Sequence, residues 1–328
     1  MTKALVTGAA GFIGSHVASW LLADGLEVVA LDDLSGGYAD NVPAGARFVR
    51  ASVTDHQQLA ALFEREHFDY VYHLAAYAAE GLSHFIRRFN YENNLVGSIN
   101  LINLSVLHRI KCFVFTSSIA VYGRNQLPMT EDLTPQPEDP YGVSKYAVEL
   151  DLSAARHQFG LDYVVFRPHN VYGAHQNIGD KYRNVIGIFM NQILQGQPLT
   201  IFGDGTQTRA FSYIDDVAPV IARAITNSQA VGQVFNVGGD TPYTVTELAQ
   251  VVSECMGVKP DIRHLQARNE VAHAYCSHDK VRQYFALPAP VALREGVGRM
   301  AEWARATGSR ATREFAQIEI PRGLPQGW

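Results

Sequence analysis

The chain of 328 residues contains few cysteines and no long hydrophobic run. Cys112, Cys255 and Cys276 are widely spaced and form no Cys-x-x-Cys pair, which argues against a disulfide framework and favours a reducing, cytoplasmic compartment. No apolar stretch approaches the ~20 residues of a membrane span, and the first expected strand begins at Lys3, so we expect neither export nor membrane binding. The formal net charge of -5 gives no general attraction to nucleic acid. Any phosphate group must therefore be bound by local residues.

Hydrophobic residues make up 47% of the chain, enough for one large domain or two unequal lobes. Up to residue 167, short apolar stretches alternate with helical stretches. The expected strands are 3–7, 27–31, 46–50, 69–74, 111–116 and 161–166. The expected helices are 12–25, 55–66, 84–108 and 141–159. These repeated strand–helix–strand units predict an α/β fold with a doubly wound parallel sheet that is covered on both faces.

The regular alternation ends after residue 167, which predicts a smaller second lobe. We expect a first lobe over residues 1–167 and a mainly C-terminal lobe over residues 168–328. Residues 234–239 have the pattern of a core strand, so a segment near 212–240 is expected to return to the first lobe. The tail 320–328 lacks helical or strand periodicity and is expected to pack as an irregular coil.

Glycines in the first expected turn predict a dinucleotide site. Gly8, Gly11 and Gly14 lie between a strand and an apolar helix, where they allow a tight turn and a close approach of the backbone to a pyrophosphate. Asp32, at the end of the second strand, can accept hydrogen bonds from both ribose hydroxyls of NAD. No Lys or Arg stands within residues 4–46 to pair with a 2′-phosphate. The pattern therefore predicts NAD rather than NADP.

A second motif predicts an acid–base group. Tyr141 and Lys145 are four residues apart and share one face of an expected helix, although such a pair alone is also compatible with a solvated helix face. An ammonium ~4 Å from the phenol is worth about 1 to 4 kcal/mol, so we expect the pKa of Tyr141 to be lowered towards the range of a general base. The preceding strand, 111–116, ends in Ser117 and Ser118. Ligands bind at the carboxyl ends of parallel strands, so both serines are expected beside the substrate.

Histidines do not point to a metal site. His73 lies on an expected strand and His169 lies beside a polar loop, so both are expected to be core or wall residues. The chain has no His-x-Glu or His-Glu-x-x-His spacing. We therefore predict no metal.

Together these motifs resemble the extended short-chain dehydrogenase/reductase family. Further motifs of that family occur at residues 121–123, 167–173, 203–205 and 213–217, so the resemblance covers nearly the whole chain. It implies a Rossmann NAD-binding lobe, a nucleotide-sugar lobe and a homodimer built from helices within 90–108 and 141–159. Within the family, the chain is most similar to the UDP-glucose 4-epimerase branch. This implies interconversion of UDP-glucose and UDP-galactose.

The resemblance also assigns residues. Tyr141 would take the proton from the sugar 4-hydroxyl, Lys145 would bind the nicotinamide ribose, and Ser118 would bridge substrate and tyrosine. The residues implied at NAD are Gly8, Gly11, Phe12, Ile13, Gly14, Asp32, Asp33, Ser52, Val53, Leu74, Ala75, Ala76, Asn94, Ser117, Tyr141, Lys145 and Pro168. The residues implied at the UDP-sugar are Ser118, Tyr141, Asn170, Asn184, Val185, Thr200, Phe202, Arg209, Arg268 and Tyr275. The two arginines are expected at the diphosphate, because a guanidinium pairs bidentately with phosphate oxygens.

Several positions depart from the family pattern. Ser52 stands where relatives have the aspartate that contacts adenine. The loop 77–83 lacks the arginine of uronate-processing relatives, and Asn177 replaces another, so uronic acids lose support as substrates. Glu80, in the same loop, either contacts the sugar or binds only solvent or backbone. Tyr275 stands where relatives with a bulky residue prefer plain hexoses, so N-acetylated sugars are expected to be disfavoured about 10- to 100-fold.

Two other activities stay open from the sequence. A ketoreductase or dehydratase of the same family would differ by net redox change or by loss of water. Ile119 and Ala120 stand where dehydratases carry acidic residues, which disfavours water elimination. A non-catalytic NAD sensor is the other alternative, and the presence of both Tyr141 and Lys145 disfavours it.

Overall fold

The structure is a computed structural model that describes residues 2–268, 270–312 and 314–325. Its centre is a parallel seven-stranded sheet with strand order β11-β6-β5-β4-β1-β2-β3. The strands are β1 (Lys3–Thr7), β2 (Glu27–Asp32), β3 (Arg47–Arg50), β4 (Tyr70–His73), β5 (Cys112–Thr116), β6 (Tyr163–Pro168) and β11 (Val234–Val237). All six strands expected up to residue 167 are present, with ends that differ by up to two residues. The predicted fold class is confirmed.

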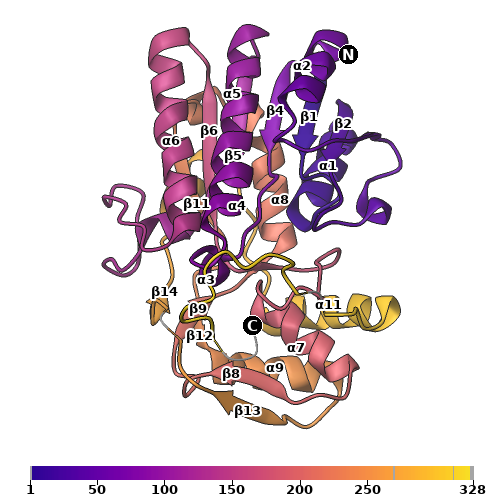
Figure 1. Ribbon diagram of the computed structural model, residues 1–328, viewed down its shortest axis with the longest axis vertical. Coiled ribbons are helices and arrows are strands. Elements are labelled where there is room, and N and C mark those ends of the chain that lie inside the picture. Colours follow the sequence, from indigo (N-terminus) through magenta and orange to yellow (C-terminus); the bar gives the residue numbers. More distant parts are fainter. Residues whose placement is uncertain (1, 269, 313, 326–328) are drawn as a thin grey trace.

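Helices cover both faces of this sheet, as Figure 1 shows. On one face α1 (Phe12–Ala23) packs against α8 (Ile214–Ala222), and on the other lie α2 (His56–Glu66), α5 (Gly97–Leu107) and α6 (Pro140–Phe159). Successive strand residues point to opposite faces. The side chain of Leu5 therefore enters the core beneath α2, α5 and α6, whereas Val6 enters the core beneath α1 and α8.

The structure divides the single helix expected over 84–108. It contains α4 (Arg87–Tyr91), a π-helical turn (Glu92–Val96) and α5. The turn carries Asn94, whose Oδ1 accepts a hydrogen bond from the Tyr77 backbone N–H at 2.8 Å and whose Nδ2 donates to the Tyr77 carbonyl at 3.1 Å. π-Helical turns redirect side chains within helices and are frequent at functional sites. Here the turn lets Asn94 fix the loop that follows β4.

Strand β11 returns to the sheet from the second half of the chain. It pairs with β6 in parallel, and α8, also from that half, packs on α1. These contacts support a segment near 212–240 that belongs to the first lobe. The lobe boundaries themselves stay a prediction.

The smaller lobe lies at the carboxyl edge of the sheet (Figure 1). Its helices are α7 (Val185–Leu194), α9 (Val245–Met256) and α11 (Leu293–Thr307), and α10 (Asp279–Tyr284) packs near β11. Its strands are β8 (Leu199–Phe202), β9 (Thr208–Ala210), β12 (Pro242–Thr244), β13 (Ile262–Leu265) and β14 (His273–Ala274). Strands β7 (Val171–Tyr172) and β10 (Ser212–Tyr213) pair where the two parts of the chain meet.

After α11 the chain runs back between the two lobes (Figure 1). Arg310 exchanges hydrogen bonds with Asn191 of α7, while Glu319 and Ile320 both donate backbone hydrogen bonds to the Phe85 carbonyl. The Glu319 carboxylate also accepts hydrogen bonds from the backbone N–H groups of Arg88 and Phe89 in the first turn of α4. Residues 320–325 form neither helix nor strand, as expected, and residues 326–328 of the expected coil lie outside the described residues.

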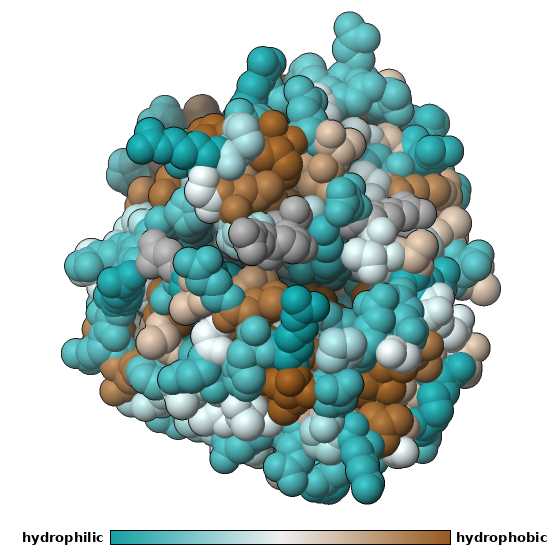
Figure 2. Space-filling model, turned by 60° about the horizontal axis from the view of Figure 1, so that its bottom comes forward, coloured by the Kyte–Doolittle hydropathy of each residue, from teal (hydrophilic) through white to brown (hydrophobic). Residues whose placement is uncertain are grey.

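The surface is mixed in polarity. Figure 2 shows hydrophilic residues over most of the face on the side of the smaller lobe, with hydrophobic patches between them. Within the described part of the chain, none of the helices combines the length and apolar character needed to cross a membrane.

Candidate active site

A cavity of about 1430 Å³ opens between the carboxyl edge of the sheet and the smaller lobe. This volume exceeds the range of about 300 to 1,000 Å³ that is typical of a pocket for one drug-sized ligand. The expected site residues that line it are Gly8, Gly11, Phe12, Ile13, Gly14, Asp32, Asp33, Val53, Leu74, Ala75, Ala76, Ser117, Ser118, Tyr141, Lys145, Pro168, Asn170, Asn184, Val185, Thr200, Phe202, Arg209 and Arg268. The fold therefore brings most of the expected residues to one cavity.

The turn between β1 and α1 leaves room only for glycine. Gly8 adopts φ +72°, and a Cβ atom at Gly14 would lie 2.1 Å from the Gly8 carbonyl oxygen. Gly37, in the loop after β2, would likewise place a Cβ atom 2.4 Å from the Ala10 carbonyl oxygen. The N-terminus of α1 thus faces the cavity with bare backbone, an arrangement that suits a pyrophosphate. These residues fit a dinucleotide.

Asp32 is held at the end of β2 by backbone groups. Its carboxylate accepts hydrogen bonds from the Ala10 N–H at 3.1 Å and the Leu34 N–H at 2.8 Å. Burial raises the pKa of Asp32, and these hydrogen bonds oppose the rise. Arg183 was not singled out in the sequence. It lies against Gly36 in the loop after β2, where a Cβ atom on Gly36 would be 2.9 Å from the Arg183 Nη2. Arg183 is already paired with Asp180 at 2.7 Å.

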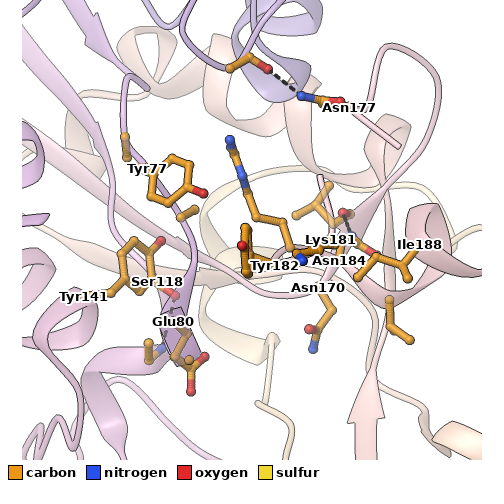
Figure 3. A pocket seen from close by; sticks show the side chains of 18 of the residues that line it. Tyr77, Glu80, Ser118, Tyr141, Asn170, Asn177, Lys181, Tyr182, Asn184 and Ile188 are labelled. Atoms are coloured by element: carbon orange, nitrogen blue, oxygen red, sulfur yellow. Dashed lines mark hydrogen bonds between the residues drawn. The ribbon is translucent and has the colours of Figure 1, made fainter. Parts of the chain in front are cut away.

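The proposed acid–base group lies at the N-terminus of α6. Tyr141 lines the cavity beside Ser118, as Figure 3 shows. Burial raises the pKa of Tyr141, and a hydrogen bond with Ser118 opposes the rise. Lys145 donates from Nζ to the Thr116 carbonyl at 2.8 Å, and burial lowers its pKa to about 7.

This electrostatic result corrects one expectation from the sequence. Through the protein groups alone, the pKa of Tyr141 is raised rather than lowered. The lysine Nζ lies 5.9 Å from the Tyr141 ring centroid, and burial disfavours the charged form of both side chains. Burial outweighs attraction between the pair, so a phenolate at Tyr141 requires further positive charge.

Two buried contacts fix α6 against the sheet. Glu149 forms a bidentate ion pair with Arg167 of β6, at 2.9 Å and 2.5 Å. The Ser117 hydroxyl at the end of β5 also donates to Glu149. Ser117 therefore supports the position of α6 in addition to lining the cavity.

The expected substrate side of the cavity comes from the smaller lobe and the loops that lead to it. Asn170 adopts φ +40° and donates from Nδ2 to the Ala210 carbonyl at 3.0 Å, while Asn184 caps α7 by accepting the Ile186 N–H at 3.1 Å. In Figure 3 both asparagines lie opposite Tyr141 and Ser118. The two asparagines shape the wall through bonds to backbone groups.

Arginines on the same side already have acidic and aromatic neighbours. The Arg268 guanidinium lies 4.6 Å from the Phe202 ring centroid and pairs with Glu270 at 3.0 Å. Arg209 lies 3.7 Å from the same carboxylate and donates to the Val271 carbonyl at 2.6 Å. Contact of both arginines with a diphosphate stays a prediction.

Three expected contact residues are not among the described residues that line the cavity. Ser52 bonds to Thr54 while its neighbours Ala51 and Val53 form the wall. Asn94 lies behind the wall, where it fixes the Tyr77 backbone, so it positions the loop.

Tyr275 is the third of these residues. Its neighbour Ala274, on β14, lines the cavity and pairs in register with Arg209 of β9. Successive residues of an extended segment point to opposite sides. The small Ala274 side chain therefore faces the cavity at the place where the large Tyr275 side chain was expected. Exclusion of N-acetylated sugars by Tyr275 therefore stays a prediction, and Ala274 is the competing wall position.

Of the two histidines singled out from the sequence, His73 lies in the core and His169 is buried in the cavity wall. His73 is bonded between Thr7 at 2.7 Å and Ser98 at 2.8 Å, and burial lowers its pKa to about 3. His169 is stacked on His278 and hydrogen-bonded to it at 3.0 Å. Both histidines are therefore held by protein partners.

Residues 4–238 match the model of the NAD dependent epimerase/dehydratase family. A curated UDP-glucose 4-epimerase from Mycolicibacterium smegmatis is 34% identical over 312 residues, which cover 92% of this chain and 98% of that protein. The chain belongs to the NAD dependent epimerase/dehydratase family, so the predicted family is confirmed and NAD is the cofactor.

Solved structures agree. The UDP-glucose 4-epimerase of Thermotoga maritima, solved with UDP-glucose, matches with a TM-score of 0.88 and 32% identity, covering 93% of this chain and 99% of that chain. A UDP-N-acetylglucosamine 4-epimerase from Methanobrevibacter ruminantium, in complex with UDP-N-acetylmuramic acid, matches with a TM-score of 0.87 and 29% identity over 93% and 99% of the two chains. The same fold thus occurs in relatives named for different sugars.

The cofactor site generates a first prediction. NAD is expected to bind at least ~10-fold more tightly than NADP, because a 2′-phosphate would face the Asp32 carboxylate and Arg183 is already paired with Asp180. Calorimetry on the cofactor-free protein measures both affinities. Asp32→Asn should narrow the ratio. Equal affinities for the unmodified protein would refute the role of Asp32.

The wall at β14 generates a second prediction. Ala274→Tyr should lower kcat/KM for UDP-N-acetylglucosamine relative to UDP-glucose by roughly 10- to 100-fold, because overpacking a close-fitting wall costs about 1 to 3 kcal/mol. Tyr275→Ser is the matched control and should change the ratio by less than about twofold. Steady-state rates on both sugars give the result. If only Tyr275→Ser brings the kcat/KM values for the two sugars closer together, Tyr275 and not Ala274 sets the preference.

Proposed function

We propose that the protein is a nucleotide-sugar 4-epimerase that interconverts UDP-glucose and UDP-galactose. The observation that carries the proposal is a pair of hydroxyls, one just after the carboxyl end of β5 and one at the N-terminus of α6. The Ser118 hydroxyl and the Tyr141 phenol share one cavity with the glycine turn of the cofactor site. Relatives named UDP-glucose 4-epimerase cover nearly the whole chain.

In the proposed reaction, Tyr141 accepts the proton of the sugar 4-hydroxyl and later returns it. NAD supplies reversible oxidation at carbon 4 when bound. Ser118 orients the hydroxyl towards the phenol, and the cavity retains the 4-keto sugar until its other face is presented. No atom is gained or lost overall.

The wall beyond Ser118 supports epimerisation over dehydration. Ile119 and Ala120 both line the cavity, so apolar side chains stand where elimination of water needs an acid and a base. A panel of nucleotide sugars, with products resolved by NMR, separates the activities. Formation of the 4-epimer supports the proposal, whereas loss of water or net formation of NADH would move the assignment to a dehydratase or a reductase.

Two further features belong to the proposal. The three cysteines are free thiols, two of them buried, which suits the reducing cytoplasm. Large exposed apolar side chains gather on the neighbouring helices α5 and α6 and on the π turn before α5, namely Val96, Leu107, Val143, Leu150 and Phe159. This surface supports a homodimer through these helices.

The acid–base role generates a third prediction. Tyr141→Phe should lower kcat by about 10²- to 10⁴-fold and leave NAD binding nearly unchanged, because it removes only the proton-carrying hydroxyl. Rates on UDP-glucose and calorimetry with NAD provide the two measurements. A variant with more than about half of the parental rate would contradict the mechanism.

The dimer surface generates a fourth prediction. Light scattering at micromolar concentration should give twice the chain mass of 36.2 kDa. Leu150→Asp should shift the protein to monomer, because a charge at a buried apolar contact is costly. Val258→Asp alters another exposed apolar residue, away from α5 and α6, and should stay dimeric. A mass near that of one chain for the unmodified protein would disprove the dimer.

A further inference from the structure

Glu80 is fixed beside the proposed acid–base group by its own backbone. It begins α3 (Glu80–Ser83), a single helical turn that packs against α6. The Ser83 hydroxyl donates to the Glu80 carbonyl at 2.6 Å and accepts the Tyr141 backbone N–H at 3.2 Å. Glu80 and Tyr141 are therefore connected through one serine, and their relative position does not depend on the smaller lobe.

The Glu80 side chain is directed into the cavity. It is exposed there, and Figure 3 shows its carboxylate below Ser118 and Tyr141. Among the described residues, none forms a hydrogen bond or ion pair with this carboxylate.

The charges around Glu80 do not neutralise it. Although the Glu80 side chain is exposed to the cavity, the protein atoms that surround it raise its pKa to about 7. Asp139 and Glu270 add to the rise, whereas Arg209 and Arg268 oppose it. Those two arginines already face Glu270, at 3.7 Å and 3.0 Å. When a ligand fills the cavity and displaces water, this carboxylate needs hydrogen-bond donors from that ligand.

We infer that Glu80 selects neutral hexoses, because its carboxylate accepts hydrogen bonds from sugar hydroxyls and repels a sugar carboxylate. The inference rests on the proposed function and names the sugar class of that same site. Hydroxyl-to-carboxylate hydrogen bonds are charge-assisted and strong, while juxtaposed like charges are strongly unfavourable. UDP-glucose and UDP-glucuronate carry the same nucleotide, so their ratio of affinities isolates the effect on the sugar.

The test measures binding of both nucleotides by calorimetry to the NAD-loaded Tyr141→Phe protein, in which turnover is strongly reduced, at pH 8.5, above the Glu80 pKa of about 7, so that the carboxylate is charged. Adding Glu80→Gln should lower the preference for UDP-glucose over UDP-glucuronate by roughly 10- to 100-fold, because the amide keeps the shape and removes the charge. Glu80→Asp keeps the charge and should keep the preference. Glu64→Gln, which removes one exposed charge outside the cavity lining, should leave the ratio unchanged.

A ratio within about twofold of the parent in Glu80→Gln, or loss of the preference in Glu80→Asp, overturns the inference. Thermal unfolding checks that each variant is folded, and Glu80→Ala replaces the glutamine variant if that one does not fold. Epimerisation by the unmodified protein is scored separately. If no 4-epimer forms but the binding ratio shifts, the proposed function fails and the role of Glu80 holds. If the epimer forms and the ratio does not shift, the role of Glu80 fails alone.

Discussion

The buried ion pair between Glu149 and Arg167 fixes the helix on which the proposed chemistry depends. Their side chains are only 5% and 4% exposed. Removal of one partner from such a pair leaves an uncompensated charge and typically costs about 3 to 5 kcal/mol, so α6 has little freedom to rotate. Tyr141, Lys145 and Glu149 recur every four residues on one face of α6. The restraint that anchors Glu149 therefore also sets the phenol and the ammonium at the end of β5.

Desolvation is the second constraint on the site. Burial raises the pKa of Tyr141 and lowers that of Lys145. The protein groups therefore favour a neutral phenol beside a lysine that loses its proton easily. Glu80 and Asp139, both acidic and both near the phenol, add to the rise. A phenolate therefore needs positive charge from outside this set, and oxidised NAD carries such a charge on its nicotinamide ring.

Much of this arrangement could be predicted from local sequence patterns. The strands, the glycine turn and the Tyr141–Lys145 spacing depend on near neighbours in the chain, so periodicity and spacing were sufficient. Arg183 lies about 150 residues from the Gly36 loop that it contacts, and only the fold brings them together.

Other parts of the site depend on single residues whose placement local sequence patterns do not fix. At the end of β14, Ala274 lines the cavity and Tyr275 follows it, and no spacing rule decides from the sequence which of the two side chains meets a sugar. The expected contact of Asn94 with the cofactor stays a prediction, while its bonds to the Tyr77 backbone depend on a π turn that the sequence does not indicate. The expected lowering of the Tyr141 pKa was wrong because burial, which cannot be read from the sequence, raises that pKa.

In the proposed reaction, carbon 4 of the sugar loses and regains the same hydrogen, while Tyr141 moves the proton of the 4-hydroxyl. The most direct test uses UDP-glucose that carries deuterium on carbon 4, incubated with the NAD-loaded protein in ordinary water, with products resolved by NMR. The expected product is UDP-galactose that keeps the deuterium on carbon 4. UDP-galactose without deuterium, a dehydrated product or unchanged substrate would contradict it.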